Sequence, residues 1–344
     1  MQADWQAFLI QRGAVIEAGT VQRFDTPGVR ETPADAQLFD LSQQGLLSVR
    51  GEDSESFLQG QLSSDMTGLA DATRLTSYST PQGRALAIMR AFRYGDSLQF
   101  LLPRELVEPI QLRLSRYVLR ARVEIGSDDH VLGRIGLAGE KASELLARLA
   151  LPDPPLAGSI AHAATLCVMN VTVAQPRYIL VAPYQQIMRI WEGAEEHAQA
   201  AGDGAWRRLL IDAGIPTVYT ATSEAFVPQM VNLELLGGVD FDKGCYTGQE
   251  IVARAQYLGR IKRRMYRFAY TGDRAPDAGD SIVLGDGSEI GTVVDAARAD
   301  SGWRMLAVIR SEVQDQPLHH SDAESPVLQR LDLPYDIPSH KESA

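Results

Sequence analysis

The sequence predicts an α+β fold with several antiparallel sheets. Pro-Gln-Gly at 81–83 and Tyr-Gly-Asp at 94–96 separate strand-like segments in the way that hairpin turns do. Strand and helix patterns then follow one another as β-α-β-β-α over 131–201. From residue 264 onward, short strands recur at the spacing of turns. Together these three observations predict the fold class.

The composition is that of a globular protein of two or three domains. The chain has 344 residues, 45% hydrophobic and 22% charged, with a formal net charge of -11. This acidity argues against general coating of nucleic acid, but it leaves a local basic patch open. No segment resembles a secretory signal or approaches the roughly 18 apolar residues of a membrane span. Because two cysteines cannot build a disulfide framework, we expect a cytoplasmic protein without membrane contact.

The first part of the chain predicts an N-terminal extension followed by a meander. Residues 26–35 are rich in Pro, Thr and Glu, which favours a surface connection. We then expect a strand, a helix, three hairpin strands and a second helix, over 46–50, 54–62, 74–80, 84–93, 97–102 and 103–119. Pro109 is expected to delay the regular part of that last helix, because proline lacks a backbone N–H.

The middle of the chain predicts a split βαβ unit of the ferredoxin-like kind, although its last strand is not evident. Its elements are a strand, a helix, two strands and a helix, over 131–137, 140–149, 166–173, 178–181 and 187–201. A short helix at 206–212 closes at Gly214 and Pro216. The remaining strands predict a small β-barrel or roll, over 265–270, 281–284, 289–296, 303–310 and 327–331.

One segment, Lys-Gly-Cys-Tyr-Thr-Gly-Gln-Glu at 243–250, carries most of the functional information. Part of it is explained by helix capping. Thr247 and Glu250 have the spacing of a capping box, and Tyr246 and Ile251 have that of a hydrophobic staple. These residues therefore predict the start of a helix whether or not they also have a function.

Lys243, Gly244 and Cys245 are not needed for that helix start. A thiol just before a helix N-terminus lies at the positive end of the macrodipole, and a lysine two residues away adds a cation. Both effects favour the thiolate, so we regard Cys245 as a candidate catalytic thiolate and Lys243 as its partner. The alternative is that Cys245 is a small buried apolar residue, as most free cysteines are.

The segment resembles the signature of the YgfZ family, folate-binding, tRNA-modifying and iron–sulfur-cluster assembly proteins related to the glycine-cleavage T-protein. The signature residues are Lys243, Gly244, Cys245, Tyr246, Thr247, Gly248, Gln249 and Glu250. Weaker similarities follow in the family's order at 57–62, 82–84, 116–120, 212–216 and 226–233. The octapeptide is specific, and the other pieces support it together.

The resemblance implies a three-domain ring around a central channel that holds tetrahydrofolate. The implied folate-binding domain is discontinuous, with a ferredoxin-like domain inserted into it and a C-terminal β-barrel after it. The divisions are 1–35 for the extension, 36–125 plus 206–262, 126–205 and 263–335. Trp206 and Asp212 match positions that face the pterin, and Gln229 and Asn232 match a family stretch. Without the resemblance, Trp206 would be interpreted as an anchor of the core and Asp212 as a solvated acid at a helix end. Gln229 and Asn232 would be interpreted as turn caps.

One departure from the T-protein pattern bears on activity. T-proteins carry paired aspartates shortly after a Gln-Gly-Gly turn, where a carboxylate helps to activate the folate. Here Gly83 is followed by Arg84 and by an apolar run over 85–89. We therefore expect a folate-binding accessory protein for iron–sulfur cluster assembly or repair, and through it for tRNA modification, rather than an aminomethyltransferase. The alternative is a folate-dependent one-carbon transferase or demethylase.

A local basic stretch and the scarcity of metal ligands bear on the expected partners. Residues 242–267 contain seven basic and two acidic residues, and the patch at 254–267 could attract RNA or the polyglutamate tail of folate. It could equally be a solvated face. Two cysteines cannot supply a four-cysteine cluster, and the histidines lack zinc spacing. We expect no resident metal. As partners we expect iron–sulfur proteins, including tRNA-modifying enzymes.

Overall fold

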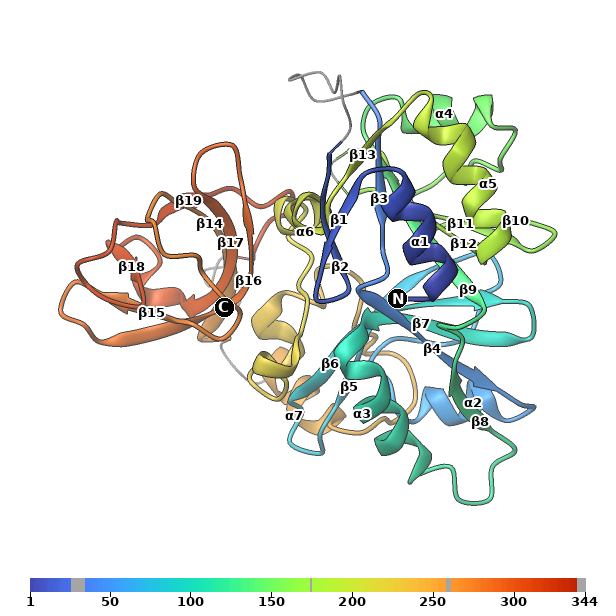
Figure 1. Ribbon diagram of the computed structural model, residues 1–344. Coiled ribbons are helices and arrows are strands. Elements are labelled where there is room, and N and C mark those ends of the chain that lie inside the picture. The colour runs from blue at the N-terminus through green and yellow to red at the C-terminus, as the bar shows by residue number, and fades with distance from the viewer. Residues whose placement is uncertain (26–34, 174, 258–260, 339–344) are drawn as a thin grey trace. The chain divides into compact units, whose positions relative to one another are not determined.

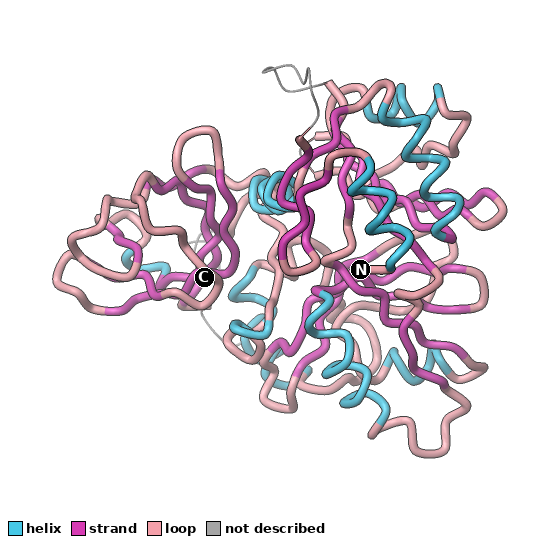
Figure 2. The backbone as a smooth tube through the Cα atoms, viewed as in Figure 1, coloured by secondary structure: helices cyan, strands magenta, loops and turns pink. Residues whose placement is uncertain are grey.

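The computed structural model describes residues 1–25, 35–173, 175–257 and 261–338, and they form a mixed fold of sheets and short helices (Figures 1 and 2). The chain divides into two compact units. Unit 1 comprises Met1–Ser54, Gly68–Arg74 and Arg90–Trp206, and unit 2 comprises Glu55–Thr67, Leu75–Met89 and Arg207–Ala344. The three-domain division expected from the resemblance stays a prediction.

Unit 1 opens with a helix and a hairpin and contains a six-stranded sheet. The opening elements are α1 (Ala3–Gln11), β1 (Ala14–Glu17) and β2 (Thr20–Phe24). The strand order of the sheet is β10-β11-β12-β9-β3-β13. Its strands are β3 (Gln37–Asp40), β9 (Leu132–Ala138), β10 (Ile160–Ala163), β11 (Leu166–Asn170), β12 (Arg177–Pro183) and β13 (Gln199–Ala201), with helices α4 (Ala142–Arg148) and α5 (Tyr184–Glu195).

The β-α-β-β-α order expected for this region is present as β9, α4, β11, β12 and α5, but an unexpected strand, β10, stands between α4 and β11 and pairs with β11. Two further details differ. The place beside β9 is taken by β3, which comes from far upstream and runs antiparallel to β9. The helix expected to reach residue 201 ends at Glu195, and Gln199–Ala201 pair with β3 instead. Gly202, directly after β13, also lets the chain pass close to β2, since a Cβ there would lie 1.9 Å from the carbonyl oxygen of Gln22. Strand pairing therefore overrides the helical preference of the alanines.

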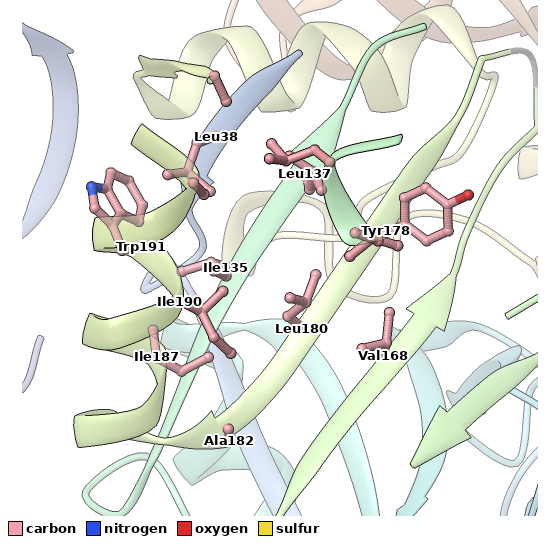
Figure 3. Close-up of a cluster of buried hydrophobic side chains, with 14 of the residues drawn as sticks. Leu38, Ile135, Leu137, Val168, Tyr178, Leu180, Ala182, Ile187, Ile190 and Trp191 are labelled. Carbon is pink, nitrogen blue, oxygen red and sulfur yellow. The ribbon is translucent and has the colours of Figure 1, made fainter. Parts of the chain in front are cut away.

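One face of this sheet forms the core of unit 1 (Figure 3). Leu38, Ile135 and Leu180 project from neighbouring strands toward Ile187 and Trp191 of α5, and all five are nearly inaccessible to solvent. Because side chains alternate along a strand, the residues between them point to the other face. That second face carries Phe39, Gly136 and Arg177.

A five-stranded sheet has the order β5-β6-β7-β4-β8, and the consecutive β5, β6 and β7 confirm the expected meander. Its strands are β4 (Gln44–Arg50), β5 (Arg74–Ser79), β6 (Ala85–Tyr94), β7 (Ser97–Pro103) and β8 (Glu124–Ser127). Helices α2 (Ser54–Gln59) and α3 (Arg104–Ser115) accompany it. Pro109 lies inside α3 rather than delaying it, and the buried face of Leu106, Ile110 and Leu114 holds the helix in place.

Unit 2 ends in a curled sheet with the order β18-β15-β16-β17-β14-β19 (Figure 1). Its strands are β14 (Arg263–Tyr270), β15 (Ser281–Leu284), β16 (Glu289–Arg298), β17 (Trp303–Arg310), β18 (Leu318–His320) and β19 (Gln329–Leu331). The expected small barrel is thus present as a six-stranded, curled half-barrel around its own apolar cluster. Before it come the 3-10 helices η1 (Thr220–Thr222) and η2 (Pro228–Val231) and helix α7 (Gln249–Tyr257), while 3-10 helix η3 (Ser311–Val313) follows β17.

Helix α6 (Asp203–Asp212) contains the boundary between the two units. Within the described ranges, no helix has both the length and the apolar character that crossing a bilayer would require.

Candidate functional site

The signature octapeptide lies in unit 2, and its second glycine is packed against the hairpin between β5 and β6. Gly248 has φ +83°, and a Cβ there would come within 2.5 Å of the Thr80 carbonyl oxygen and 2.9 Å of Gly83 Cα. A Cβ on Gly83 would in turn lie 3.0 Å from Ile251 Cβ. The two glycines therefore let the octapeptide and the hairpin touch backbone to backbone.

This packing shifts the helix start away from the expected capping box. Helix α7 begins at Gln249, two residues after Thr247, because the positive φ of Gly248 is not helical. The side chain of Gln249 accepts a hydrogen bond from the Tyr246 backbone N–H at 3.3 Å, and the Thr247 N–H donates to the Gly60 carbonyl oxygen at 3.3 Å. Ile251, expected in the staple, lies at the hairpin, where a Cβ on Gly83 would be 3.0 Å from Ile251 Cβ.

Lys243 is tied to the loop that follows α2. Its Nζ donates to the carbonyl oxygens of Leu62 at 2.8 Å and Ser64 at 2.7 Å. Burial lowers the pKa of Lys243 to about 8, against the opposing influence of the Asp65 and Asp240 carboxylates. The ammonium group also lies 5.3 Å from the centroid of the Tyr246 ring. Lys243 therefore holds the octapeptide in place and titrates closer to neutrality than an ordinary lysine.

Tyr246 is the buried member of the octapeptide. Its side chain is 7% exposed, and its hydroxyl group is buried without a hydrogen-bond partner. Burial, and to a smaller extent the charge of Asp240, raises the pKa of Tyr246 to about 12. The phenol therefore stays neutral and keeps an unused donor, which the sequence alone did not indicate.

Cys245 is exposed, so the interpretation of this thiol as a buried apolar residue is wrong. That interpretation fits Cys167 instead, whose thiol pKa burial raises to about 12. Gly244 beside Cys245 is open as well, because a Cβ there would meet nothing within 4 Å. Cys245 precedes the first helical residue by four positions, so the macrodipole of α7 acts on it more weakly than expected. Its accessibility suits chemistry, and its catalytic role stays a prediction.

Trp206, expected at the pterin, is 1% exposed in unit 1. Its ring lies 5.2 Å from that of Phe39, and a Cβ on Gly136 would lie 2.6 Å from it. Asp212, at the end of α6 in unit 2, keeps a 40% exposed side chain and accepts from Arg267 Nη1 at 3.3 Å. Stacking of a ligand on Trp206 would require uncovering its ring, whereas the Asp212 carboxylate is accessible.

Gln229 and Asn232 are fully buried and connect neighbouring elements. Gln229 Nε2 donates to the Val252 carbonyl oxygen of α7 at 2.6 Å, and Asn232 Nδ2 donates to the Met265 carbonyl oxygen of β14 at 2.8 Å. Asn232 ends η2 with φ 59°, a conformation that asparagine tolerates. The two amides therefore bond to helix α7 and strand β14, while Gln229 Oε1 is buried without a partner, and their role at a folate stays a prediction.

The basic stretch does not form one continuous surface patch. Arg264 is buried in an ion pair with Glu234, and Arg267 pairs with Asp212. Arg254, Lys262 and Arg263 are exposed, and Arg260 lies outside the described residues. The basic patch expected at 254–267 therefore keeps three exposed cations, while strand β14 directs Arg264 and Arg267 toward carboxylates. Across the described ranges, no cluster of three or more His, Cys, Asp or Glu residues is arranged to hold a metal ion.

The chain resembles known proteins over most of its length. It is 34% identical over 296 residues to the tRNA-modifying protein YgfZ of Edwardsiella ictaluri, covering 84% of this chain and 89% of that protein. It is 31% identical over 322 residues to the Yersinia pseudotuberculosis protein of the same name, covering 92% and 97%. No protein-family model matches the chain.

The fold is that of a solved transferase structure. The glycine cleavage system aminomethyltransferase T from Bartonella henselae superimposes with a TM-score of 0.80 at 16% identity, covering 97% of each chain. At this identity the likeness concerns the fold alone, whereas the sequence relatives show the family. On the level of identity and coverage that they show, the chain belongs to the YgfZ family of tRNA-modifying proteins.

Proposed function

We propose that this chain is a folate-binding accessory protein that supports the assembly or repair of iron–sulfur clusters and thereby tRNA modification. The names of its relatives support the link to tRNA modification, and its transferase-like fold is compatible with a folate. Tetrahydrofolate and iron–sulfur proteins, including tRNA-modifying enzymes, are the partners that this function requires. We propose a cytoplasmic location, as the two cysteines suggest.

The observation that carries the proposal is the exposed Cys245 thiol on a rigidly held octapeptide. Lys243 is bonded to two backbone carbonyls, and Gly248 is packed on the hairpin, so the thiol is presented from a fixed backbone. A single thiolate can supply one ligand to iron, and the other ligands would come from the partner that delivers or receives the cluster. The cluster is cargo in this proposal, not a resident cofactor.

The residues expected to hold the folate fit it only in part. Asp212 is accessible and chemically suited to the N–H donors of a pterin. Trp206 is covered, and Gln229 and Asn232 are buried, each with its amide nitrogen donating to a backbone carbonyl. The proposal of folate binding therefore rests on the family resemblance and on Asp212, and we derive no chemical step through the folate.

A complementation experiment tests the proposed role of the thiol. In a strain lacking this protein, Cys245→Ser should leave the activities of iron–sulfur enzymes low, whereas Gly244→Ala should restore them. Gly244→Ala is the matched control because its new Cβ meets no atom and the thiol is retained. Full restoration by Cys245→Ser would remove Cys245 from the function.

The alternative, a one-carbon transferase or demethylase, is less well supported by the strand that follows Gly83. The first five residues of β6, from Ala85 to Met89, are apolar and buried, and none is a carboxylate. Turnover of an aminomethyl or methyl donor by the purified protein would favour this alternative over the accessory function.

The exposed cations Arg254, Lys262 and Arg263 support a further part of the proposal, contact with RNA or a polyglutamate tail. Replacing all three with glutamine should reduce the salt-dependent part of such binding. Unchanged affinity at low salt would contradict this role.

A further inference from the structure

One face of helix α3 in unit 1 is exposed to solvent. The helix contacts β4, β7 and β8, and its buried residues are Leu106, Val107, Ile110 and Leu114. Its exposed residues are Glu105, Glu108, Pro109, Leu112, Ser115 and Arg116. They recur every three or four positions, so they form one continuous stripe opposite the buried face. Because Arg116, the C-cap, keeps helical dihedral angles, the stripe includes it.

The stripe is acidic before its centre and basic after it. Glu108 and Arg116 lie one helical turn before and one after Leu112, whose side chain is 57% exposed. Across the residues that the structure describes, neither the Glu108 carboxylate nor the Arg116 guanidinium has a hydrogen-bond or ion-pair partner. At 1.5 Å per residue they are about 12 Å apart along the helix, which is too far for them to pair with each other.

Apolar side chains are exposed beside these two charges. Leu112 is followed by Tyr117 at 47% and Leu119 at 88% exposure. Leu119 also has φ 47°, a backbone conformation that is unfavourable for leucine. Single exposed apolar residues are common on protein surfaces, but a group of them that is bordered by polar residues marks an interaction site.

The stripe is complementary to itself. When two copies of α3 lie antiparallel around a two-fold axis beside Leu112, residues equally far before and after Leu112 lie opposite each other. Glu108 of each copy then faces Arg116 of the other, and the two copies of Leu112 meet at the centre. Pro109 and Ser115, which flank the centre, are small enough to let two helices approach to about 8–10 Å. A parallel arrangement would instead place like charges opposite each other.

We propose that the exposed stripe of α3 is the interface of a symmetric homodimer, so that its occupant is a second copy of this chain. An RNA or an acidic protein would pair with Arg116 but would repel Glu108, whereas a second copy satisfies both. A contact of one helix pair is at the low end of specific interface sizes, so we expect a dimer in equilibrium with the monomer. The inference does not rest on the proposed function.

Sedimentation of the full chain over a range of concentrations tests the dimer. From about 1 to 500 µM, the average mass should rise from 37.6 kDa toward twice that value. In Glu108→Arg, and likewise in Arg116→Glu, the apparent Kd of the dimer should weaken about tenfold or more, because like charges then face each other at both ends of the interface. Both changes affect exposed side chains without partners, so each variant should keep the wild-type Tm.

A mixture of the two charge-reversed variants is the most specific measurement. In a mixed dimer, one pair of opposite charges is native and the other has its two charges exchanged between the helices. The variants should therefore associate with each other about as strongly as the wild type does, although neither associates with itself. Arg189→Glu is the matched control, because it reverses an exposed arginine of α5 in the same unit and should keep the wild-type association.

Three outcomes overturn the proposal. They are a wild type that stays at the monomer mass at every concentration, single variants that self-associate as the wild type does, and a mixture in which association is not restored. Leu112→Gln is an independent check should either reversed variant fail to fold, since it removes only the apolar contact at the centre. Wild-type association of this variant would contradict the interface. None of these results bears on the role of Cys245, because the experiment requires neither a cluster nor a folate.

Discussion

At the scale of single residues, neighbours in the octapeptide have opposite surroundings. Lys243 is partly buried and bonded to two carbonyls, Tyr246 is buried with an unused hydroxyl, and Cys245 is exposed between them. The sequence singled out Lys243 and Cys245 as candidates because a cation beside a thiol is recognisable as a pattern. It also named Tyr246 as a signature residue, but it could not show that the Tyr246 hydroxyl is buried without a partner, because that burial depends on segments distant in the chain.

The lowered pKa of Lys243 predicts a pH dependence of stability. Its folded pKa of about 8 lies below the value of 10.5 for a free lysine, so the unfolded state binds more protons between these two pH values. Stability from this group should therefore rise as pH increases from about 8 toward 10. Urea unfolding of the wild type and of Lys243→Met would measure it, and the difference in free energy of unfolding should grow with pH in favour of the wild type. A difference independent of pH would show that the lysine pKa is ordinary.

At the scale of elements, the contact between the octapeptide and the β5–β6 hairpin fixes where α7 begins. Capping rules predicted a helix start near Thr247. The helix begins at Gln249 instead, because Gly248 packs against Thr80, a residue far away in the sequence. The strand Gln199–Ala201 was missed for a similar reason, because its pairing partner β3 lies far upstream. Local patterns thus predicted the order of these elements, while long-range contacts set their ends.

Gly248→Ala tests the contact between the octapeptide and the hairpin. The new Cβ would lie 2.5 Å from the Thr80 carbonyl oxygen at a φ of +83°. We expect a loss of about 2 kcal/mol or more in the free energy of unfolding, from the left-handed conformation and the clash together. Gly244→Ala should lose almost nothing, and equal losses in the two variants would contradict the close packing.

The buried pair of Arg264 and Glu234 joins the segment after η2 to β14, and it gives a second prediction at this scale. Their side chains are 8% and 6% exposed, and Arg264 Nη1 also donates to the Gln229 carbonyl oxygen at 2.8 Å. Glu234→Gln should cost about 3 kcal/mol of stability, because it leaves the arginine charge buried and unpaired. Glu234→Gln/Arg264→Met should cost less than the sum of the two single changes. Additive losses in this double-mutant cycle would show that the pair is not coupled.

At the scale of the whole molecule, the chain shares the fold of an aminomethyltransferase but lacks the paired aspartates of the T-protein pattern after Gly83. The likeness to the aminomethyltransferase covers 97% of the chain at 16% identity, yet β6 begins with five buried apolar residues where the T-protein pattern has paired aspartates. The fold class could be predicted from turn spacing and helical periodicity, and the family from the octapeptide. The expected pterin contact of Trp206 could not be judged from sequence, because a covered and an open indole look alike there.

The level of iron–sulfur-dependent tRNA modification tests the central proposal most directly. It is measured by mass spectrometry of nucleosides from a strain that lacks the protein and carries either Cys245→Ser or Gly244→Ala at wild-type abundance. We expect Gly244→Ala to restore the modified nucleosides. Cys245→Ser should leave them near the level of the strain that carries no copy of the protein. Restoration by both variants would contradict the proposal that the exposed thiol carries the function.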